Sequence, residues 1–103
     1  MRIIKEVAKR IKEELHDAEW YAEKAIEHKA LHPDLAEEYI RLAKEEHAHS
    51  TLLHDKVVAL IRKASTEKEV PPAMREMWEW QHGEIIEEEA EVKRLLEMYA
   101  SHT

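Results

Sequence analysis

The chain has 103 residues, which is enough for one small domain, residues 1–103, and too few for two. Its net charge of −7 argues against nucleic acid as a partner, and no apolar run approaches the ~20 residues that a membrane-spanning helix needs. One glycine, no cysteine and an abundance of Ala, Leu, Glu and Lys favour an all-α fold and exclude disulfides and thiolate ligands, so any metal site must consist of histidine and carboxylate groups.

Prolines divide the chain into three segments. Pro33 and Pro72 each stand where the first turn of a helix tolerates the missing backbone N–H. The spacing predicts helices over about residues 2–31, 34–64 and 73–100, with no linker or repeat between them. We therefore expect a helical hairpin followed by a third long helix.

The first predicted helix carries an apolar stripe with a period of about 3.6 residues. Its members are Ile4, Val7, Ile11, Leu15, Ala18, Ala22 and Ala25. Glu14 and Tyr21 lie at the edge of this stripe, so we expect Glu14 to point toward the core or close to it.

The second predicted helix has polar residues in the middle of its apolar stripe. The aligned positions are Leu35, Tyr39, Leu42, Glu46, His49, Leu53, Val57 and Leu60. Glu46 and His49 interrupt the stripe where we expect it to be most buried, and an unpaired buried carboxylate is costly. The pattern therefore indicates that these two side chains have a partner in the core.

The third predicted helix has an apolar stripe with polar residues on both flanks. The stripe consists of Met74, Trp78, Ile85, Val92, Leu96 and Tyr99. His82 and Glu89 lie on one flank, and Gln81 and Glu88 lie on the other. We expect this helix to pack against the hairpin, since its stripe must be covered.

Glu46 and His49 form a Glu-x-x-His pair that is suited to chelation. The two side chains stand one helical turn apart on the same face, so both can reach one cation. If the first two helices form an antiparallel hairpin, Glu14 lies within about one to two turns of both. Glu14, Glu46 and His49 are therefore candidate catalytic residues and metal ligands. The alternative is an ion-paired Glu–His network that sets the register of the helices.

The number of ligands indicates a dimer. Ferritin-like di-iron carboxylate sites take a Glu from each of two helices and a Glu-x-x-His pair from each of two others. A twofold dimer of hairpins supplies this set and forms a ferritin-like four-helix bundle around a di-iron centre. Carboxylate and imidazole donors also admit Mn or Zn. The rise per residue along the second and third helices places Glu89, or else His82, at the level of the metals. We expect this residue to be an additional metal ligand or a ligand of an entry site. Otherwise the third helix only covers the bundle or builds the oligomer interface.

Two segments of the chain resemble the encapsulated ferritins, which are half-length ferritin-like di-iron proteins, and half-length relatives of rubrerythrin look similar. They are EELHDAEWYAEKA (13–25), with a Glu six residues before a Trp-Tyr pair, and HPDLAEEYIRLAKEEHAH (32–49), with Glu-x-x-His thirteen residues after Pro33. The resemblance covers about residues 10–60. It implies a dimer around a di-iron centre, ring-like assembly, ferroxidase activity and an encapsulin shell as a partner. It also places three residues on the family's ferroxidase ligands: Glu14, Glu46 and His49.

We therefore expect an oxidoreductase that oxidises Fe(II) with O₂ at a site shared between two chains. One alternative is a non-enzymatic helical assembly module with Trp20 and Trp80 as interface anchors, and another is a redox-inert Zn- or Mn-binding protein. The expected partners are metal ions and further copies of this chain, with no nucleic acid and no membrane. The N-terminus has no signal-peptide pattern, so we expect a cytoplasmic protein, inside a protein compartment if it is packaged.

Overall fold

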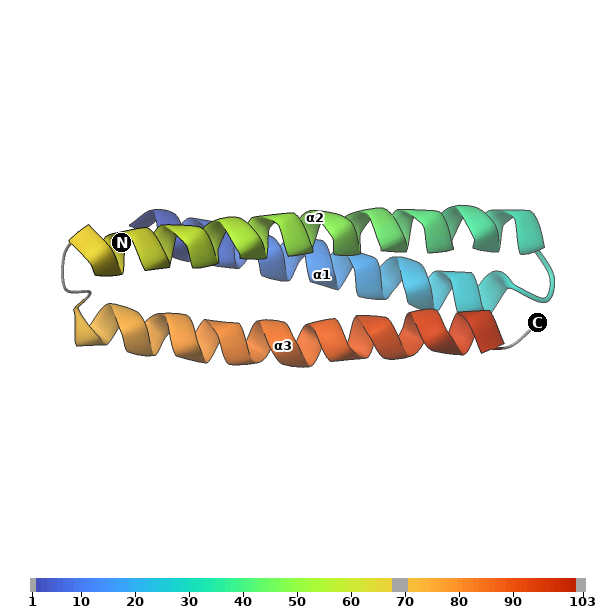
Figure 1. Cartoon of the computed structure of the whole chain (residues 1–103). Helices are drawn as coiled ribbons and strands as arrows, with labels where there is room; N and C mark the ends of the chain where they lie inside the picture. The colour runs from blue at the N-terminus through green and yellow to red at the C-terminus, as the bar shows by residue number, and fades with distance from the viewer. Residues whose placement is uncertain (1, 68–70, 102–103) are drawn as a thin grey trace.

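Three helices make up the computed structural model, which describes residues 2–67 and 71–101. They are α1 (Arg2–His28), α2 (Pro33–Glu67) and α3 (Pro72–Ser101), and the described residues contain no strand. α1 and α2 form an antiparallel hairpin, and α3 runs parallel to α1 (Figure 1). The predicted all-α chain of a hairpin and a third long helix is thus confirmed. None of these helices, over the described residues, contains a stretch apolar enough to cross a membrane.

The helix ends differ from the predicted ones by a few residues. α1 ends at His28 and not at residue 31, and residues 29–31 form a turn. The turn closes with the His32 N–H donating to the His28 carbonyl at 2.8 Å. α2 and α3 each begin on their proline, one residue earlier than predicted, and each ends later than predicted. Proline fits the first position because the N–H there has no helical partner.

α1 is the central helix of the bundle. It packs against both α2 and α3, whereas α2 and α3 touch each other over a much shorter length. Its core cluster joins Val57 of α2 with Ile85 and Val92 of α3. The buried face of α1 agrees with the predicted stripe, except that Val7 is half-buried and Ala8 and Glu14 are included. Its residues are Ile4, Ala8, Ile11, Glu14, Leu15, Ala18, Ala22 and Ala25.

The buried face of α2 is not the predicted one. Its buried residues are Ala36, Ile40, Ala43, Ser50 and Val57. Apart from Val57, each stands one position after a member of the predicted stripe, which corresponds to a rotation of about 100° around the helix axis. Three of these five side chains, those of Ala36, Ala43 and Ser50, are small. The Ser50 hydroxyl tolerates burial because it donates to the His47 carbonyl at 2.6 Å.

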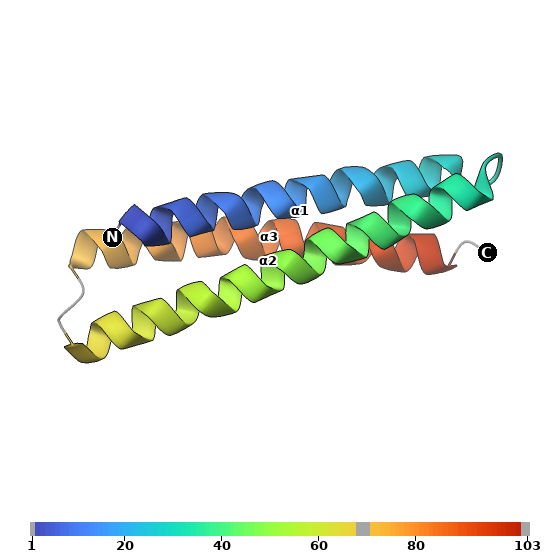
Figure 2. The ribbon, with the colours of Figure 1, turned by 90° about the horizontal axis from the view of Figure 1, so that it is seen from above.

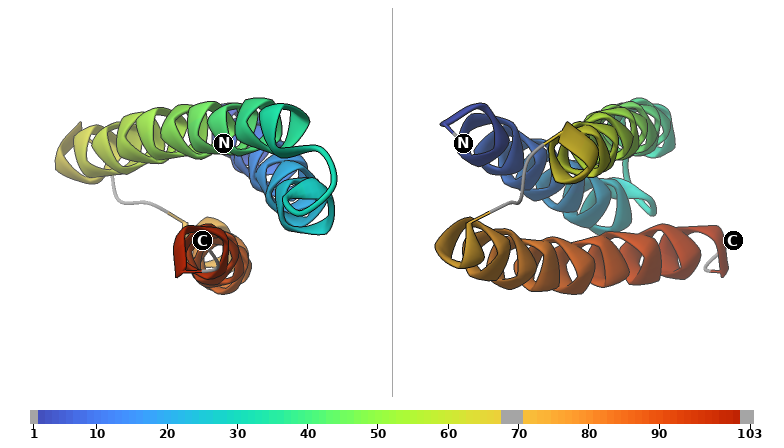
Figure 3. Two further views of the ribbon diagram at one scale, coloured as in Figure 1. Left: turned by 90° about the vertical axis from the view of Figure 1, so that its right-hand side faces the viewer. Right: turned by 60° about the vertical axis from the view of Figure 1, so that its left-hand side comes forward.

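Side-chain size sets the spacing between the helices. Near the α1–α2 turn, Ala22 and Ala43 pack together with Leu95 of α3, and such small residues let the helix axes approach closely. Toward the other end α2 diverges from α1 and α3 (Figure 2). Views along and across the bundle place α3 on one face of the hairpin (Figure 3). The opposite face of the hairpin is therefore uncovered in a single chain.

Candidate metal centre

Glu14 is carried into the core by the face of α1 on which it lies. Ile11 and Ala18, one turn before and one turn after it, are fully buried. The Glu14 side chain is only 7% exposed, as the sequence pattern predicted. Burying this apolar face thus places a carboxylate where it needs a positively charged or hydrogen-bonding partner.

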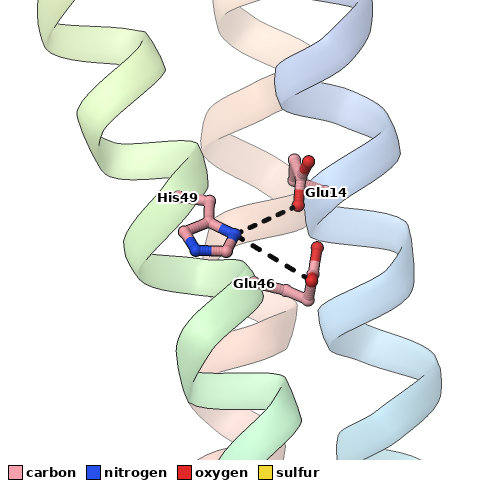
Figure 4. Close-up of side chains that lie close together, drawn as sticks. All are labelled: Glu14, Glu46 and His49. Carbon is pink, nitrogen blue, oxygen red and sulfur yellow. Dashed lines mark ion pairs between the residues drawn. The ribbon is translucent and has the colours of Figure 1, made fainter.

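Glu46 and His49 of α2 meet Glu14 across the hairpin (Figure 4). The His49 Nδ1 atom lies 3.7 Å from Glu14 Oε2 and 4.0 Å from Glu46 Oε1. One ligand atom from each residue lies within 4.8 Å of the other two. We call these three residues the hairpin cluster, and their predicted proximity is present in the fold. The α3 ribbon passes behind them, so the cluster gathers on the hairpin face opposite α3.

The hairpin cluster is more open to solvent than its place in the sequence pattern suggested. The expectation that Glu46 and His49 occupy the most buried part of α2 is wrong, because the helix is rotated. The His49 side chain is 57% exposed and that of Glu46 is 22% exposed. In one chain the cluster therefore has a buried end at Glu14 and an open end at His49.

The Glu14 carboxyl raises the pKa of the Glu46 carboxyl beside it. A hydrogen bond to Glu14, burial and the Glu14 charge together raise the pKa of Glu46 to about 7, and the nearby His49 acts in the opposite direction. When both carboxylates are ionised, the enclosed Glu14 Oε2 atom has no hydrogen-bond donor among the described residues. A divalent cation placed between them would replace the shared proton.

Arg10 is a member of the site that sequence reasoning missed. Its guanidinium Nη2 lies 2.8 Å from Glu14 Oε1, and its Nη1 lies 3.1 Å from Glu13 Oε2. The i,i+4 spacing of Arg10 and Glu14 on one helix is the sequence signal that would have found this pair. Arg10 is well exposed, so its side chain is able to move away when another cation binds.

The structure places Glu89 and His82 in the contact between α2 and α3, outside the hairpin cluster. Glu89 Oε1 lies 3.2 Å from His47 Nε2, and His82 Nε2 lies 3.0 Å from His54 Nε2. Burial lowers the pKa of His82, and the neighbouring His54 lowers it further. The flank of α3 that carries these two residues therefore faces α2, and its contacts are made with histidines that the ligand prediction did not include.

The donor set of the hairpin cluster fits several first-row metals. Two carboxylates and one imidazole suit Fe, Mn and Zn better than Ca or Mg, which prefer oxygen ligands alone. Three protein donors also leave coordination positions for water, dioxygen or ligands from another chain.

Comparisons with known proteins gave no match. No protein-family model, no curated protein and no solved structure matches this chain at a significant level. The function must therefore be inferred from the side chains of the protein itself.

Proposed function

We propose that this chain is a ferritin-like di-iron protein that oxidises Fe(II) with O₂ at a centre shared between two copies of the chain. The convergence of Glu14, Glu46 and His49 from two helices carries this proposal. It is half of the ligand set of ferritin-like di-iron carboxylate proteins, which take two such halves. The resemblance of residues 13–25 and 32–49 to encapsulated ferritins supports the same assignment.

A second hairpin would complete the site from the face opposite α3. His49 is exposed there, and the apolar stripe of α2 that contains it is only partly covered in one chain. Its other apolar members are Leu35, Tyr39, Leu42, Leu53 and Leu60, which are exposed or half-buried, and Val57, which is fully buried. A twofold axis through this face would bury the stripe and supply each ligand twice. The homodimer is then the smallest active unit, on which ring-like assembly or packaging in a shell would build.

Each residue of the hairpin cluster has a distinct role in this proposal. Glu14 and Glu46 hold the substrate iron, and their negative charge favours Fe(III) over Fe(II). His49 adds a neutral donor, and Glu46 releases its proton when the cation binds. Each Fe(II) gives one electron to O₂, which takes up protons as it is reduced. Mn or Zn would bind to the same donors.

Iron oxidation by ligand variants tests the proposal. The parent protein should oxidise Fe(II) in air faster than buffer does, and Glu46→Ala or His49→Ala should abolish the excess rate while most of the helical content remains. Glu45→Ala is the matched control, because Glu45 is an exposed neighbour on the same helix. If both ligand variants oxidise iron at the parental rate, the hairpin cluster is structural.

A second candidate is a helical assembly module in which the cluster only sets the helix register. The Arg10–Glu14 ion pair favours it, because it neutralises the buried carboxylate without a metal. The indole of Trp80, 66% exposed, would serve as an interface anchor. The metal content of untagged protein separates the candidates: stoichiometric iron supports the oxidase, bound Zn or Mn without O₂ consumption indicates a redox-inert metal protein, and metal-free protein supports the module.

A further inference from the structure

A second group of metal-ligating side chains lies between α1 and α3. One ligand atom from each of His16, Glu19 and Glu88 lies within 4.8 Å of the other two. His16 and Glu19 stand one turn apart on α1, and Glu88 reaches them from the flank of α3 that faces α1. The hairpin cluster has the same plan, in which a Glu/His pair one turn apart on one helix meets a Glu of its neighbour.

Among the residues that the structure describes, the carboxylates of this second group have no lysine or arginine paired with them. One turn earlier along the same α1–α3 contact, Lys12 Nζ lies 2.7 Å from Glu84 Oε1. Within the described ranges, Glu19 and Glu88 have no such ion pair with a lysine or an arginine. The Glu88 Oε1 atom is fully enclosed and has no hydrogen-bond partner in that part of the chain. Glu88 therefore lacks the cationic partner that Glu84, one turn earlier on α3, has in Lys12.

The electrostatics of the carboxyl pair agree with this geometry. A hydrogen bond to Glu88, burial and the charges of Glu88 and Glu91 together raise the pKa of Glu19 to about 7. His16 acts in the opposite direction. Without a cation, the two carboxyls avoid full repulsion only by keeping a proton.

We propose that His16, Glu19 and Glu88 bind one divalent transition-metal cation, in a site that is complete within a single chain. Two carboxylates and an imidazole select Zn²⁺, Mn²⁺ or Fe²⁺ over Ca²⁺ and Mg²⁺. The cation joins α1 to α3, as the Lys12–Glu84 pair does one turn earlier. This site goes beyond the proposed oxidase function, since it shares no residue with the hairpin cluster and needs neither O₂ nor a second chain.

Zn²⁺ binding by the full chain tests the site. In the variant Glu46→Gln/His49→Asn, which removes the hairpin cluster, calorimetry should still detect one Zn²⁺ per chain. Adding Glu88→Gln should weaken Zn²⁺ binding at least about 10-fold. Loss of a residue that only hydrogen-bonds to a metal ligand already weakens metal binding by about 10-fold or more, and Glu88 is proposed as a ligand itself. Glu87→Gln is the matched control, because Glu87 is the exposed neighbour on the same helix and should leave the affinity unchanged. Zn²⁺ should also raise the unfolding temperature of the control and not that of the Glu88→Gln protein.

Three results would overturn the proposal: no Zn²⁺ bound by the variant without the hairpin cluster, binding only at millimolar Zn²⁺, or equal affinities for the Glu88→Gln and Glu87→Gln proteins. If Glu88→Gln does not fold, His16→Asn decides, because His16 is exposed and its replacement leaves the packing intact. In the otherwise parental chain, Glu88→Gln should leave the excess rate of Fe(II) oxidation unchanged. Loss of this site is thereby distinguished from failure of the oxidase proposal.

Discussion

The Glu14 carboxylate contacts the Arg10 guanidinium of its own helix, and in the proposed function it would also bind a metal ion together with Glu46 and His49. Arg10 contacts Oε1 at 2.8 Å, while Oε2 faces His49 at 3.7 Å. Arg10 therefore compensates the buried charge in the metal-free protein and repels a second cation. Because the guanidinium is exposed, its pairing is screened by water and gives way at modest cost.

Removing Arg10 should consequently strengthen metal binding. We expect Arg10→Gln to bind Zn²⁺ about two- to fivefold more tightly than the parent, a small factor because the ion pair that it abolishes is solvated. Arg41→Gln is the control, since Arg41 is an exposed arginine of α2 that pairs with Glu38 at 2.9 Å. Calorimetric titration measures both. An unchanged or weaker affinity in Arg10→Gln would show that the guanidinium helps to hold the site together.

The shared proton of the hairpin cluster should appear in the pH dependence of stability. The folded-state pKa of Glu46 is raised from 4.5 to about 7, so between these values the folded protein keeps a proton that the unfolded chain has lost. The stability of the metal-free protein should therefore fall as pH rises through this window. In Glu46→Gln the fall should be smaller by about 1 kcal/mol, less than the full shift implies because Glu46 is partly solvated.

Urea unfolding at a series of pH values, with a chelator present, measures this effect. Glu19 has a pKa raised to about 7 as well, so part of the fall should remain in Glu46→Gln. Glu45→Gln serves as the control, because Glu45 is exposed. Identical pH slopes in the Glu45 and Glu46 variants would contradict a proton shared with Glu14.

α2 has two apolar faces that could pack against α1, and the face with the smaller side chains is the one that does so. Ala43 is fully buried against Ala22, whereas Leu52, one turn after His49, is 62% exposed. Close packing of α1 on α2 leaves no room for larger residues at the alanine positions. Large apolar side chains such as that of Leu52 are thereby left exposed on the other side of α2.

Enlarging Ala43 tests the orientation of α2. We expect Ala43→Leu to destabilise the protein by about 1–3 kcal/mol, because the added atoms have no space between the helices. Ala48→Leu makes the same chemical change at an exposed position of α2 and should change stability by less than about 0.5 kcal/mol. Chemical denaturation compares the two. If Ala48→Leu proves the more damaging, α2 turns its other face inward.

At the scale of the whole molecule, the bundle is long and thin. It measures 55 × 18 × 17 Å, and its radius of gyration of 16.4 Å exceeds the ~13 Å of a compact domain of similar length. A slender bundle covers less of its apolar surface than a compact one, because more residues lie near solvent. This shape is consistent with a chain that packs against a second copy.

Charge substitutions on two faces of the bundle identify the surface that associates. At micromolar concentration with Fe(II) under anaerobic conditions, light scattering should detect a dimer of the parent chain. Leu52→Glu, beside His49, should shift it toward the monomer and reduce iron oxidation, because the charge would be buried at the interface. Ile86→Glu, on the exposed side of α3, should leave the dimer intact. If Ile86→Glu and not Leu52→Glu disrupts the dimer, or if the parent chain is a stable monomer, the proposal of a metal centre shared between two chains is wrong.

The three helices, the buried stripe of α1 and the proximity of Glu14 to Glu46 and His49 were predictable from the sequence. The reason is local: proline positions delimit the helices, residues three or four apart share a face, and a fixed rise per residue matches levels across a hairpin. These rules do not depend on what the helices pack against. They therefore located the hairpin cluster without the tertiary structure.

Only the tertiary structure decided the rotation of α2, the histidine partners of Glu89 and His82, and the second group at Glu88. A helical pattern with two adjacent apolar stripes does not specify which one turns inward. That choice depends on how closely the helices approach, which the alanines of both helices determine together. The partners of flanking polar residues depend in turn on the rotation of α2 and on the face of the hairpin that α3 covers, which are relations between segments distant in the chain.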